Sequence, residues 1–312
     1  MDEATSPLGL RKGRDSSPRP LRSKISCMYL GYNTNGLAHH ALSDAVRLVH
    51  EIGYRGIAIT VDHGALDPFG PSFESELAKV KTLIQETGMR TVIETGARFL
   101  LDPNRKHHPT LLCVGSADRD RRIDFLCRAI DIAAALESDC VSFWSGHADD
   151  DAADYPDDDQ LWHRLTTTLK PVIAHALKQG VAIGFEPEPG MFIDTMGQYA
   201  ELLRRMGDDT DAIRLTLDVG HLHCLGEVPI AAQIARWADR IVNVHIEDMR
   251  AGVHEHLMFG EGEMDFPPIL QALGQSGYEG GVYVELSRHS HCGPDAARQS
   301  FEFLDRLNDE TK

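Results

Sequence analysis

Short apolar runs alternate along the chain with longer stretches in which apolar residues recur at helical spacing. The apolar runs predict strands at 25–30, 56–60, 90–94, 140–144, 181–186, 214–218, 240–247 and 282–286. The stretches after them predict helices at 42–53, 73–87, 121–137, 158–179, 195–206, 229–238, 266–275 and 294–308. Gly53, Gly88 and Gly180 follow three of these helices, at the position where glycine commonly ends a helix. The pattern is a strand–helix unit that repeats along the chain.

This repetition predicts the fold class. Strands that alternate with helices pair in parallel through crossover connections. Eight units of roughly 30 to 40 residues match a closed barrel better than an open sheet. The strand runs are apolar without strict alternation, as expected for a sheet that is covered on both faces. We therefore predict an α/β fold, a single (β/α)8 TIM barrel over residues 24–312. Residues 1–23 are rich in Ser, Pro, Arg and Lys, which predicts a disordered N-terminal tail.

Composition narrows the classes of partner and compartment. The chain carries 31 Lys and Arg against 48 Asp and Glu, a formal net charge of −17. An acidic surface repels phosphate backbones, so nucleic acid is disfavoured as a partner. The 6 cysteines lie far apart without a C-x-x-C pair, which favours reduced thiols. No apolar run reaches the roughly 20 residues that span a bilayer, and no apolar segment follows the basic N-terminus. These features predict a cytoplasmic protein without membrane association.

Ionisable residues gather at the carboxyl ends of the last four predicted strands, which carry Glu186, Asp218, His245 and Glu285 in turn. In a parallel barrel these strand ends form the active-site face, and consecutive strands are neighbours, so the four side chains converge. Three carboxylates and one imidazole suit a divalent Mn²⁺, Mg²⁺, Co²⁺ or Zn²⁺ ion. Any one of the four could form a structural salt bridge instead. Together they predict one divalent metal site, because a shared cation offsets the cost of burying the charges.

Further polar side chains follow the same strand ends, and we expect them to bind the substrate. They are His63, Glu94, Trp144, Glu188, His221, Arg250 and His256. A lone histidine is more often structural than functional. His221 and His256 are stronger candidates because both lie beside the predicted metal ligands.

The motifs FEPEPG, LDVGH, VNVHIEDMR, HLMFGEGEMDF and VYVEL together resemble the xylose isomerase-like TIM barrel superfamily. Its members include sugar and sugar-phosphate isomerases and epimerases, inosose dehydratases and AP endonucleases. The resemblance implies that Glu186, Asp218, His245 and Glu285 bind the metal. It also implies proton transfer through an enediolate, with Glu186 and Glu285 as general acid and base and His221 on the substrate's oxygens.

Two positions depart from the sugar 3-epimerases of this superfamily. Phe192 stands where those enzymes carry a second glutamate, and Ala251 stands where they carry a substrate-binding arginine. Glu188 and Arg250 could substitute for them. A free ketohexose is therefore a doubtful substrate, and isomerisation, epimerisation and dehydration all stay open.

The AP endonuclease branch offers an alternative, a metal-dependent phosphoester hydrolase. His221, His254 and His256 match a second metal position of that branch, and imidazole also suits zinc. The full cluster needs further histidines after strands two and four. His63 could serve for strand two, but Trp144 occupies the other position, so the cluster looks incomplete. A barrel that binds a metabolite without turnover is a third reading.

One loop suggests an acidic substrate. The stretch after the third predicted strand contains Arg98, Arg105, Lys106, His107 and His108. Arg and Lys on the active-site face would suit a phosphate or carboxylate, which gives a small carbohydrate-like substrate that carries a phosphate as one hypothesis. A solvated loop that pairs with the protein's own carboxylates is the alternative. The sequence does not name the substrate, the metal or the oligomeric state, and a homodimer stays open.

Overall fold

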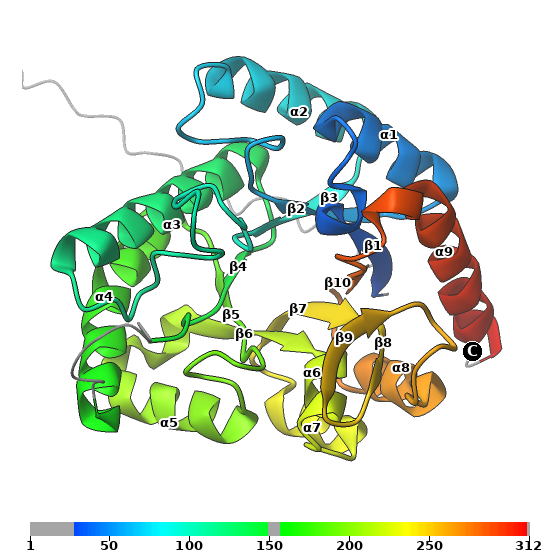
Figure 1. Cartoon of the computed structure of the whole chain (residues 1–312). Helices are drawn as coiled ribbons and strands as arrows, with labels where there is room; N and C mark the ends of the chain where they lie inside the picture. The colour runs from blue at the N-terminus through cyan, green and yellow to red at the C-terminus, as the bar shows by residue number, and fades with distance from the viewer. Residues whose placement is uncertain (1–27, 149–156, 311–312) are drawn as a thin grey trace, which may run out of the picture.

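The computed structural model describes residues 28–148 and 157–310, so the predicted tail at 1–23 lies outside the described residues. Parallel strands close into a barrel in the order β1-β10-β7-β6-β5-β4-β3-β2 (Figure 1). The barrel strands are β1 (Tyr29–Asn33), β2 (Gly56–Thr60), β3 (Arg90–Glu94), β4 (Val141–Phe143), β5 (Ile183–Phe185), β6 (Ile213–Asp218), β7 (Ile241–Ile246) and β10 (Gly281–Val284). The first and last strands pair from Tyr29 with Gly281 to Tyr32 with Val284. The prediction of a single (β/α)8 barrel is confirmed.

Helices surround the barrel strands (Figure 1). They are α1 (Leu42–Ile52), α2 (Phe73–Thr87), α3 (Ser116–Leu136), α4 (Asp158–Gln179), α5 (Met196–Met206), α6 (Val219–Cys224), α7 (Ile230–Trp237), α8 (Phe266–Gln275) and α9 (Gly293–Glu310). Short 3-10 turns occur at η1 (Thr34–Leu37), η2 (Gly207–Ala212) and η3 (Ser290–Cys292). Gly88 and Gly180 end α2 and α4 in the left-handed conformation, with φ of 67° and 70°, as the sequence predicts. Within residues 28–148 and 157–310, no helix is long and apolar enough to cross a bilayer.

Apolar side chains close the amino-terminal end of the barrel interior. Tyr29, Ala58, Val92, Cys140 and Tyr283 form a buried cluster that draws on five neighbouring strands or strand starts. Close packing inside the barrel leaves no pore at this end. The carboxylates and imidazoles of the candidate site lie at the opposite, carboxyl end of the strands.

Two elements beside the candidate site were not expected from the sequence. The short helix α6 begins directly after β6, and the Asp218 side chain accepts a hydrogen bond from the backbone N–H of His221 at 2.9 Å. An antiparallel hairpin of β8 (Asp248–Arg250) and β9 (Val253–Leu257) follows β7 and contacts α6 (Figure 1). Asp248 fixes the loop after this hairpin by accepting backbone N–H groups of Gly260, Gly262 and Met264. Together they bring new polar groups against the strand ends.

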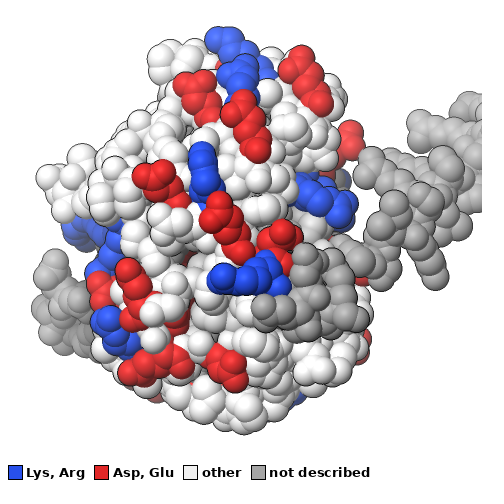
Figure 2. All heavy atoms as spheres, turned by 90° about the vertical axis from the view of Figure 1, so that its right-hand side faces the viewer, with Lys and Arg blue, Asp and Glu red and all other residues white. Residues whose placement is uncertain are grey.

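Charged side chains on the surface do not separate by sign on the visible face. Figure 2 shows Lys and Arg interspersed with Asp and Glu over the side of the barrel that lies on the right of Figure 1. Such a face carries no single-sign field that would steer a polyanion.

Candidate metal centre and active site

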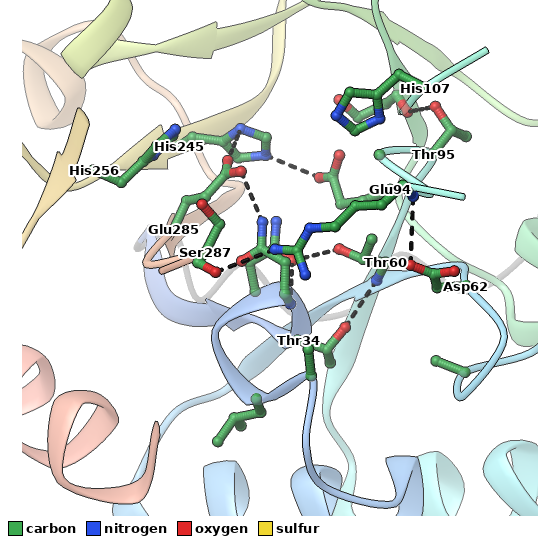
Figure 3. Close-up of a pocket in the computed structure, with 18 of the residues that line it drawn as sticks. Thr34, Thr60, Asp62, Glu94, Thr95, His107, His245, His256, Glu285 and Ser287 are labelled. Carbon is green, nitrogen blue, oxygen red and sulfur yellow. Dashed lines mark hydrogen bonds and ion pairs between the residues drawn. The ribbon is translucent and has the colours of Figure 1, made fainter. Parts of the chain in front are cut away.

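A cavity of about 530 Å³ opens at the carboxyl end of the barrel strands. Its lining includes residues from the ends of β1, β2, β3, β4, β5, β7 and β10. In Figure 3 the labelled side chains of Glu94, His245, Glu285 and Ser287 are drawn together around this space. The volume suits a ligand of small-molecule size.

The four predicted metal ligands converge on one point, and three of them, Glu186, His245 and Glu285, line this cavity. Nδ1 of His245 lies 3.0 Å from Oε1 of Glu186 and 2.8 Å from Oε2 of Glu285. Asp218 Oδ2 lies 3.9 Å from the same nitrogen and is buried without a hydrogen-bond partner. One ligand atom from each of the four residues lies within 4.8 Å of the others. The oxygen-rich donor set and the unpartnered carboxylate oxygen therefore fit a divalent cation.

The opposite edge of the His245 ring is held by a second buried carboxylate. Nε2 of His245 lies 2.9 Å from Oε1 of Glu94 (Figure 3). The same oxygen of Glu94 accepts a hydrogen bond from Asn243 Nδ2 at 3.0 Å. A carboxylate on one ring nitrogen leaves the other nitrogen to bind a metal. Glu94 was predicted to bind the substrate. It lines the cavity, so this stays a prediction, and it also contacts the ring of His245.

The environment separates the two candidate acid–base carboxyls. Burial raises the pKa of Glu186 to about 8, although the charge of His245 opposes this. Burial also acts to raise the pKa of Glu285, but the charge of His245 and a hydrogen bond to it bring that pKa below its usual range. Asn35 adds a hydrogen bond from Nδ2 to Oε1 of Glu285 at 2.8 Å. Two carboxyls with opposite pKa shifts are a common arrangement in acid–base catalysis.

A second group of polar side chains lies beside the quartet, on α6 and the β8–β9 hairpin. Nε2 of His221 lies 3.4 Å from Oδ2 of Asp218 and 3.7 Å from Oε2 of Glu188. The rings of His221 and His254 meet edge to face, with 4.8 Å between their centroids. One ring nitrogen from each of His221, His254 and His256 lies within 4.8 Å of the others, so the three predicted histidines come together.

Glu247 completes this second group, and sequence reasoning missed it. It follows β7 and is 0% exposed, and neither carboxylate oxygen has a hydrogen-bond partner among the described residues. Its Oε2 lies 3.8 Å from Nδ1 of His256. A period-two pattern could have found it, because Asn243, His245 and Glu247 alternate along one strand and all three are buried.

A family model described as the xylose isomerase-like TIM barrel matches residues 46–307. The chain belongs to this family. The inosose dehydratase of Lacticaseibacillus casei is 31% identical over 156 residues, which are 45% of this chain and 51% of that protein. The chain thus spans about half the length of the curated relatives that it matches.

Solved structures of the same architecture superpose on most of this family member. A structure of L-ribulose 3-epimerase covers 91% of this chain and 96% of its own, with a TM-score of 0.72 and 18% identity. The 3-keto-D-glucoside 4-epimerase from E. coli covers 90% of this chain and 100% of its own, with a TM-score of 0.71 and 17% identity. At such identities the likeness extends to the fold.

Among the other predicted substrate-binding residues, His63, Trp144, Glu188 and His256 line the cavity, whereas His221 and Arg250 do not. Trp144 and Glu188 line it, and Trp144 meets the ring of His107 edge to face. His63 lies at the rim, with 65% of its side chain exposed and Asp67 at 3.4 Å. Arg250 is not among the lining residues, and its guanidinium donates to the carbonyl oxygen of Glu261 at 3.0 Å. The geometry gives no support to a substrate contact from Arg250.

The predicted basic cluster is only partly directed at the cavity. Arg98, Lys106 and His107 line it, and Arg288 from the loop after β10 joins them. Arg105 is absent from the lining because it turns to Asp102, with 3.0 Å between Nε and the carboxylate. The prediction of Arg105 at the substrate is therefore revised.

The end of β1 supplies cavity residues that the sequence analysis did not identify. Asn33, Thr34 and Asn35 line the cavity, and Asn33 accepts a hydrogen bond from the Thr60 hydroxyl at 2.7 Å. The sequence places the first strand at 25–30, whereas β1 ends at Asn33. Because the predicted strand ends too early, these polar residues were assigned to no strand end.

Proposed function

We propose that this protein is a metal-dependent isomerase or epimerase that moves a proton at a carbon beside a carbonyl of a sugar or related polyol. The observation that carries the proposal is the placement of Glu186 and Glu285. Both reach Nδ1 of His245, at 3.0 and 2.8 Å, and their pKa values shift in opposite directions. Two carboxyls at one site can divide the work of a proton transfer, one removing the proton and the other returning it.

Glu186, Asp218, His245 and Glu285 would hold the divalent metal. Their converging donor atoms and the unpartnered Oδ2 of Asp218 support this assignment. A divalent cation supplies Lewis acidity that polarises a carbonyl and makes the neighbouring C–H more acidic. Glu94 orients His245 for this role through the contact at 2.9 Å.

Glu186 and Glu285 are the candidates for the group that removes the proton and the group that returns it. The Asn35 hydrogen bond to Glu285 fixes the carboxylate in place. An epimerase would return the proton to the same carbon from the other side, and an isomerase would return it to the neighbouring carbon. Loss of a hydroxyl instead would give a dehydratase.

The cavity supports a compact polar substrate. Carboxylates and imidazoles at its base suit hydroxyl groups, and Arg98 with Lys106 near its mouth suits a phosphate or carboxylate. The curated relative above is named an inosose dehydratase, and the solved relatives are named sugar epimerases. We place the substrate among sugars, inososes and their phosphates.

A phosphoester hydrolase is the second candidate, because His221, His254 and His256 come within ligand distance of one another. The exposed His63 and the presence of Trp144 at the end of β4 count against a larger cluster. A barrel that binds the metabolite without turnover is the third.

Proton NMR in D2O tests the proposal and separates these alternatives. The metal-loaded protein is incubated with sugars, inososes and sugar phosphates, and exchange is followed at carbons beside the carbonyl. We expect metal-dependent deuterium incorporation in one substrate class, and its loss in Glu285→Gln. Binding without exchange would favour the non-catalytic reading. Cleavage of an abasic DNA duplex without any such exchange would favour the hydrolase.

A further inference from the structure

Three positively charged side chains meet at the cavity from two loops that are far apart in the sequence. Arg98 and Lys106 follow β3, Arg288 follows β10, and all three line the cavity. The reaction proposed above takes place at the quartet, on Glu186 and Glu285, and leaves open which ligand group these cations bind. The cavity is thus acidic where the reaction occurs and basic in the two loops.

Hydrogen bonds hold the two loops together. Nη2 of Arg98 donates to the carbonyl oxygen of Ser287 at 3.1 Å, and Ser287 directly precedes Arg288. Within the first loop, the backbone N–H of His107 donates to the carbonyl oxygen of Arg98 at 2.6 Å, which brings Lys106 beside Arg98. The three cations are therefore neighbours because of the backbone and not by chance side-chain positions.

A buried arginine of α3 fixes the first loop to the barrel wall. Nε of Arg122 donates to the carbonyl oxygen of Pro109 at 2.7 Å, and its Nη2 donates to that of His107 at 2.6 Å. Arg122 is 3% exposed, so these bonds are shielded from water. The loop that carries Lys106 is held in place before any ligand binds, which lowers the entropy cost of binding one.

Carboxylates of the protein do not neutralise the first two cations. Among the described residues, no carboxylate oxygen lies within 4.0 Å of the Arg98 guanidinium or the Lys106 ammonium group. Arg105 of the same loop differs, because it pairs with Asp102 at 3.0 Å. A guanidinium has five N–H donors, and in the described chain Arg98 uses one of them on Ser287. Donors are therefore left for a ligand.

The net charge of the cluster matches a phosphate better than a carboxylate. Arg288 is paired with Glu255 at 2.9 Å, which leaves the two positive charges of Arg98 and Lys106. These charges repel each other: burial and the charge of Arg98 lower the pKa of Lys106, and Arg288 adds to this while Glu188 opposes it. A phosphate monoester carries about 1.5 to 2 negative charges near neutral pH. A carboxylate carries one and would leave part of the repulsion in place.

The cluster also lies within reach of the quartet. Ser287, whose carbonyl oxygen binds Arg98, stands two residues after Glu285 and is drawn close to it in Figure 3. Two residues of chain span at most about 7 Å. A small molecule in the cavity of about 530 Å³ can therefore contact the quartet and the cluster at the same time.

We propose that Arg98, Lys106 and Arg288 form a subsite for the phosphate group of a phosphorylated sugar or polyol. The proposal rests on the proposed function for the position of the reacting carbonyl, which lies at the quartet while the phosphate lies in the cluster. Arginine binds phosphate through paired N–H groups and lysine binds it as a point charge. The subsite selects phosphate esters over free sugars and over sugar acids.

Titration of inorganic phosphate into the metal-loaded protein, followed by phosphorus NMR, tests the subsite without a known substrate. We expect saturable binding, with a Kd that rises about 10- to 100-fold in Arg98→Gln and in Lys106→Met and less in Arg288→Gln. Arg105→Gln is the matched control from the same loop and should leave the Kd unchanged. Asp218→Asn weakens the metal site from outside the cavity lining and should also keep phosphate binding.

Three outcomes of this titration would overturn the subsite. They are the absence of saturable binding in the wild type, an unchanged Kd in both Arg98→Gln and Lys106→Met, and a loss of binding in Asp218→Asn alone, which would place the phosphate on the metal. Acetate that binds as tightly as phosphate would overturn the choice of phosphate in favour of a sugar acid. Lys106→Met keeps the test decisive if Arg98→Gln does not fold, because the Lys106 side chain has no hydrogen bond in the described chain.

Deuterium exchange separates failure of the subsite from failure of the proposed function. The pairs D-fructose with D-fructose 6-phosphate and D-ribulose with D-ribulose 5-phosphate are compared in D2O. We expect a KM for exchange that is at least about tenfold lower for the ester, and a preference that Lys106→Met removes and Arg105→Gln keeps. Exchange with an equal or lower KM for the free sugars would overturn the subsite and leave the proposed function intact. Phosphate binding that depends on Lys106, without exchange in any pair, would support the subsite and count against the proposed function.

Discussion

Glu94 offers a test of how the metal site is positioned, because it touches His245 on the edge away from the quartet. Its Oε1 lies 2.9 Å from Nε2 of His245 and accepts from Asn243 Nδ2 at 3.0 Å. Both side chains are buried, with 5% of Glu94 and 1% of His245 exposed. Glu94→Gln keeps the shape but removes the charge that fixes the ring and its tautomer.

The expected loss of metal affinity follows from the typical effect of removing a contact to a metal-binding histidine. Changes to groups that orient a metal-binding histidine weaken metal affinity about 10- to 100-fold. This corresponds to about 1.4 to 2.8 kcal/mol of binding free energy. We expect the Kd for Mn²⁺ to rise in Glu94→Gln by a factor within this 10- to 100-fold range. We also expect the fold decrease in kcat to be smaller than the fold increase in the KM for the metal.

The titration conditions matter because Glu94 also acts on the proton of His245. Burial lowers the pKa of His245, but Glu94, Glu186 and Glu285 together raise it well above its usual value. Glu94→Gln therefore makes that proton easier to displace, which favours metal binding. This opposing effect shrinks as pH rises, so the calorimetry is repeated at several pH values.

Glu76→Gln serves as the control for the change of carboxylate to amide. Glu76 lies on α2 and accepts the backbone N–H of Leu66 at 3.2 Å, away from the metal ligands. An unchanged Kd in Glu94→Gln would refute the positioning role. An equal loss in both variants would show that the effect is general to the fold.

Three further predictions concern the metal, the substrate and pH. Removing the metal with EDTA should lower the free energy of unfolding of the wild type by about 2.7 kcal/mol relative to metal at 100 times its Kd. In a thermal shift assay, Asp218→Asn should be stabilised by the metal much less than the wild type is. Arg98→Ala and Lys106→Ala should raise KM for a phosphorylated substrate, while Arg105→Ala should leave it unchanged; a rise in Arg105→Ala alone would contradict the assignment. Burial lowers the pKa of His107 to about 4, so as pH falls this histidine is protonated in the unfolded chain before it is protonated in the folded protein. The free energy of unfolding should therefore fall by at most about 3 kcal/mol as pH drops from about 6.5 to about 4. His107→Asn should lose less free energy of unfolding over this pH range, as measured by urea denaturation in the presence of EDTA. Asparagine tolerates the left-handed backbone of this position, where φ is 62°.

The barrel and the convergence of the four candidate metal ligands could be predicted from the sequence because each rests on a repeated local signal. Apolar strands and glycine-ended helices set the fold, and the fold brings consecutive strand ends together. Glu186, Asp218, His245 and Glu285 stand at such ends, so their convergence follows from the topology. This prediction required no knowledge of contacts between residues that lie far apart in the sequence.

The residues that were missed depend on contacts which the pattern does not encode. Glu247 lies buried against Gly220 on α6, a helix too short to give a periodic signal. Asn35 reaches Glu285 across the closure of the barrel, where β1 meets β10. Arg105 looked equivalent to Arg98 in the sequence, but a local pair with Asp102 turns it away.

Anomalous diffraction from crystals soaked in MnCl2 tests the central claim most directly. The account predicts a strong manganese peak about 2.0 to 2.3 Å from ligand atoms of Glu186, Asp218, His245 and Glu285. The peak should disappear in Glu285→Gln or Asp218→Asn. A wild-type crystal with no peak among these four side chains, or with its main peak elsewhere on the barrel, would contradict the assignment of the metal centre.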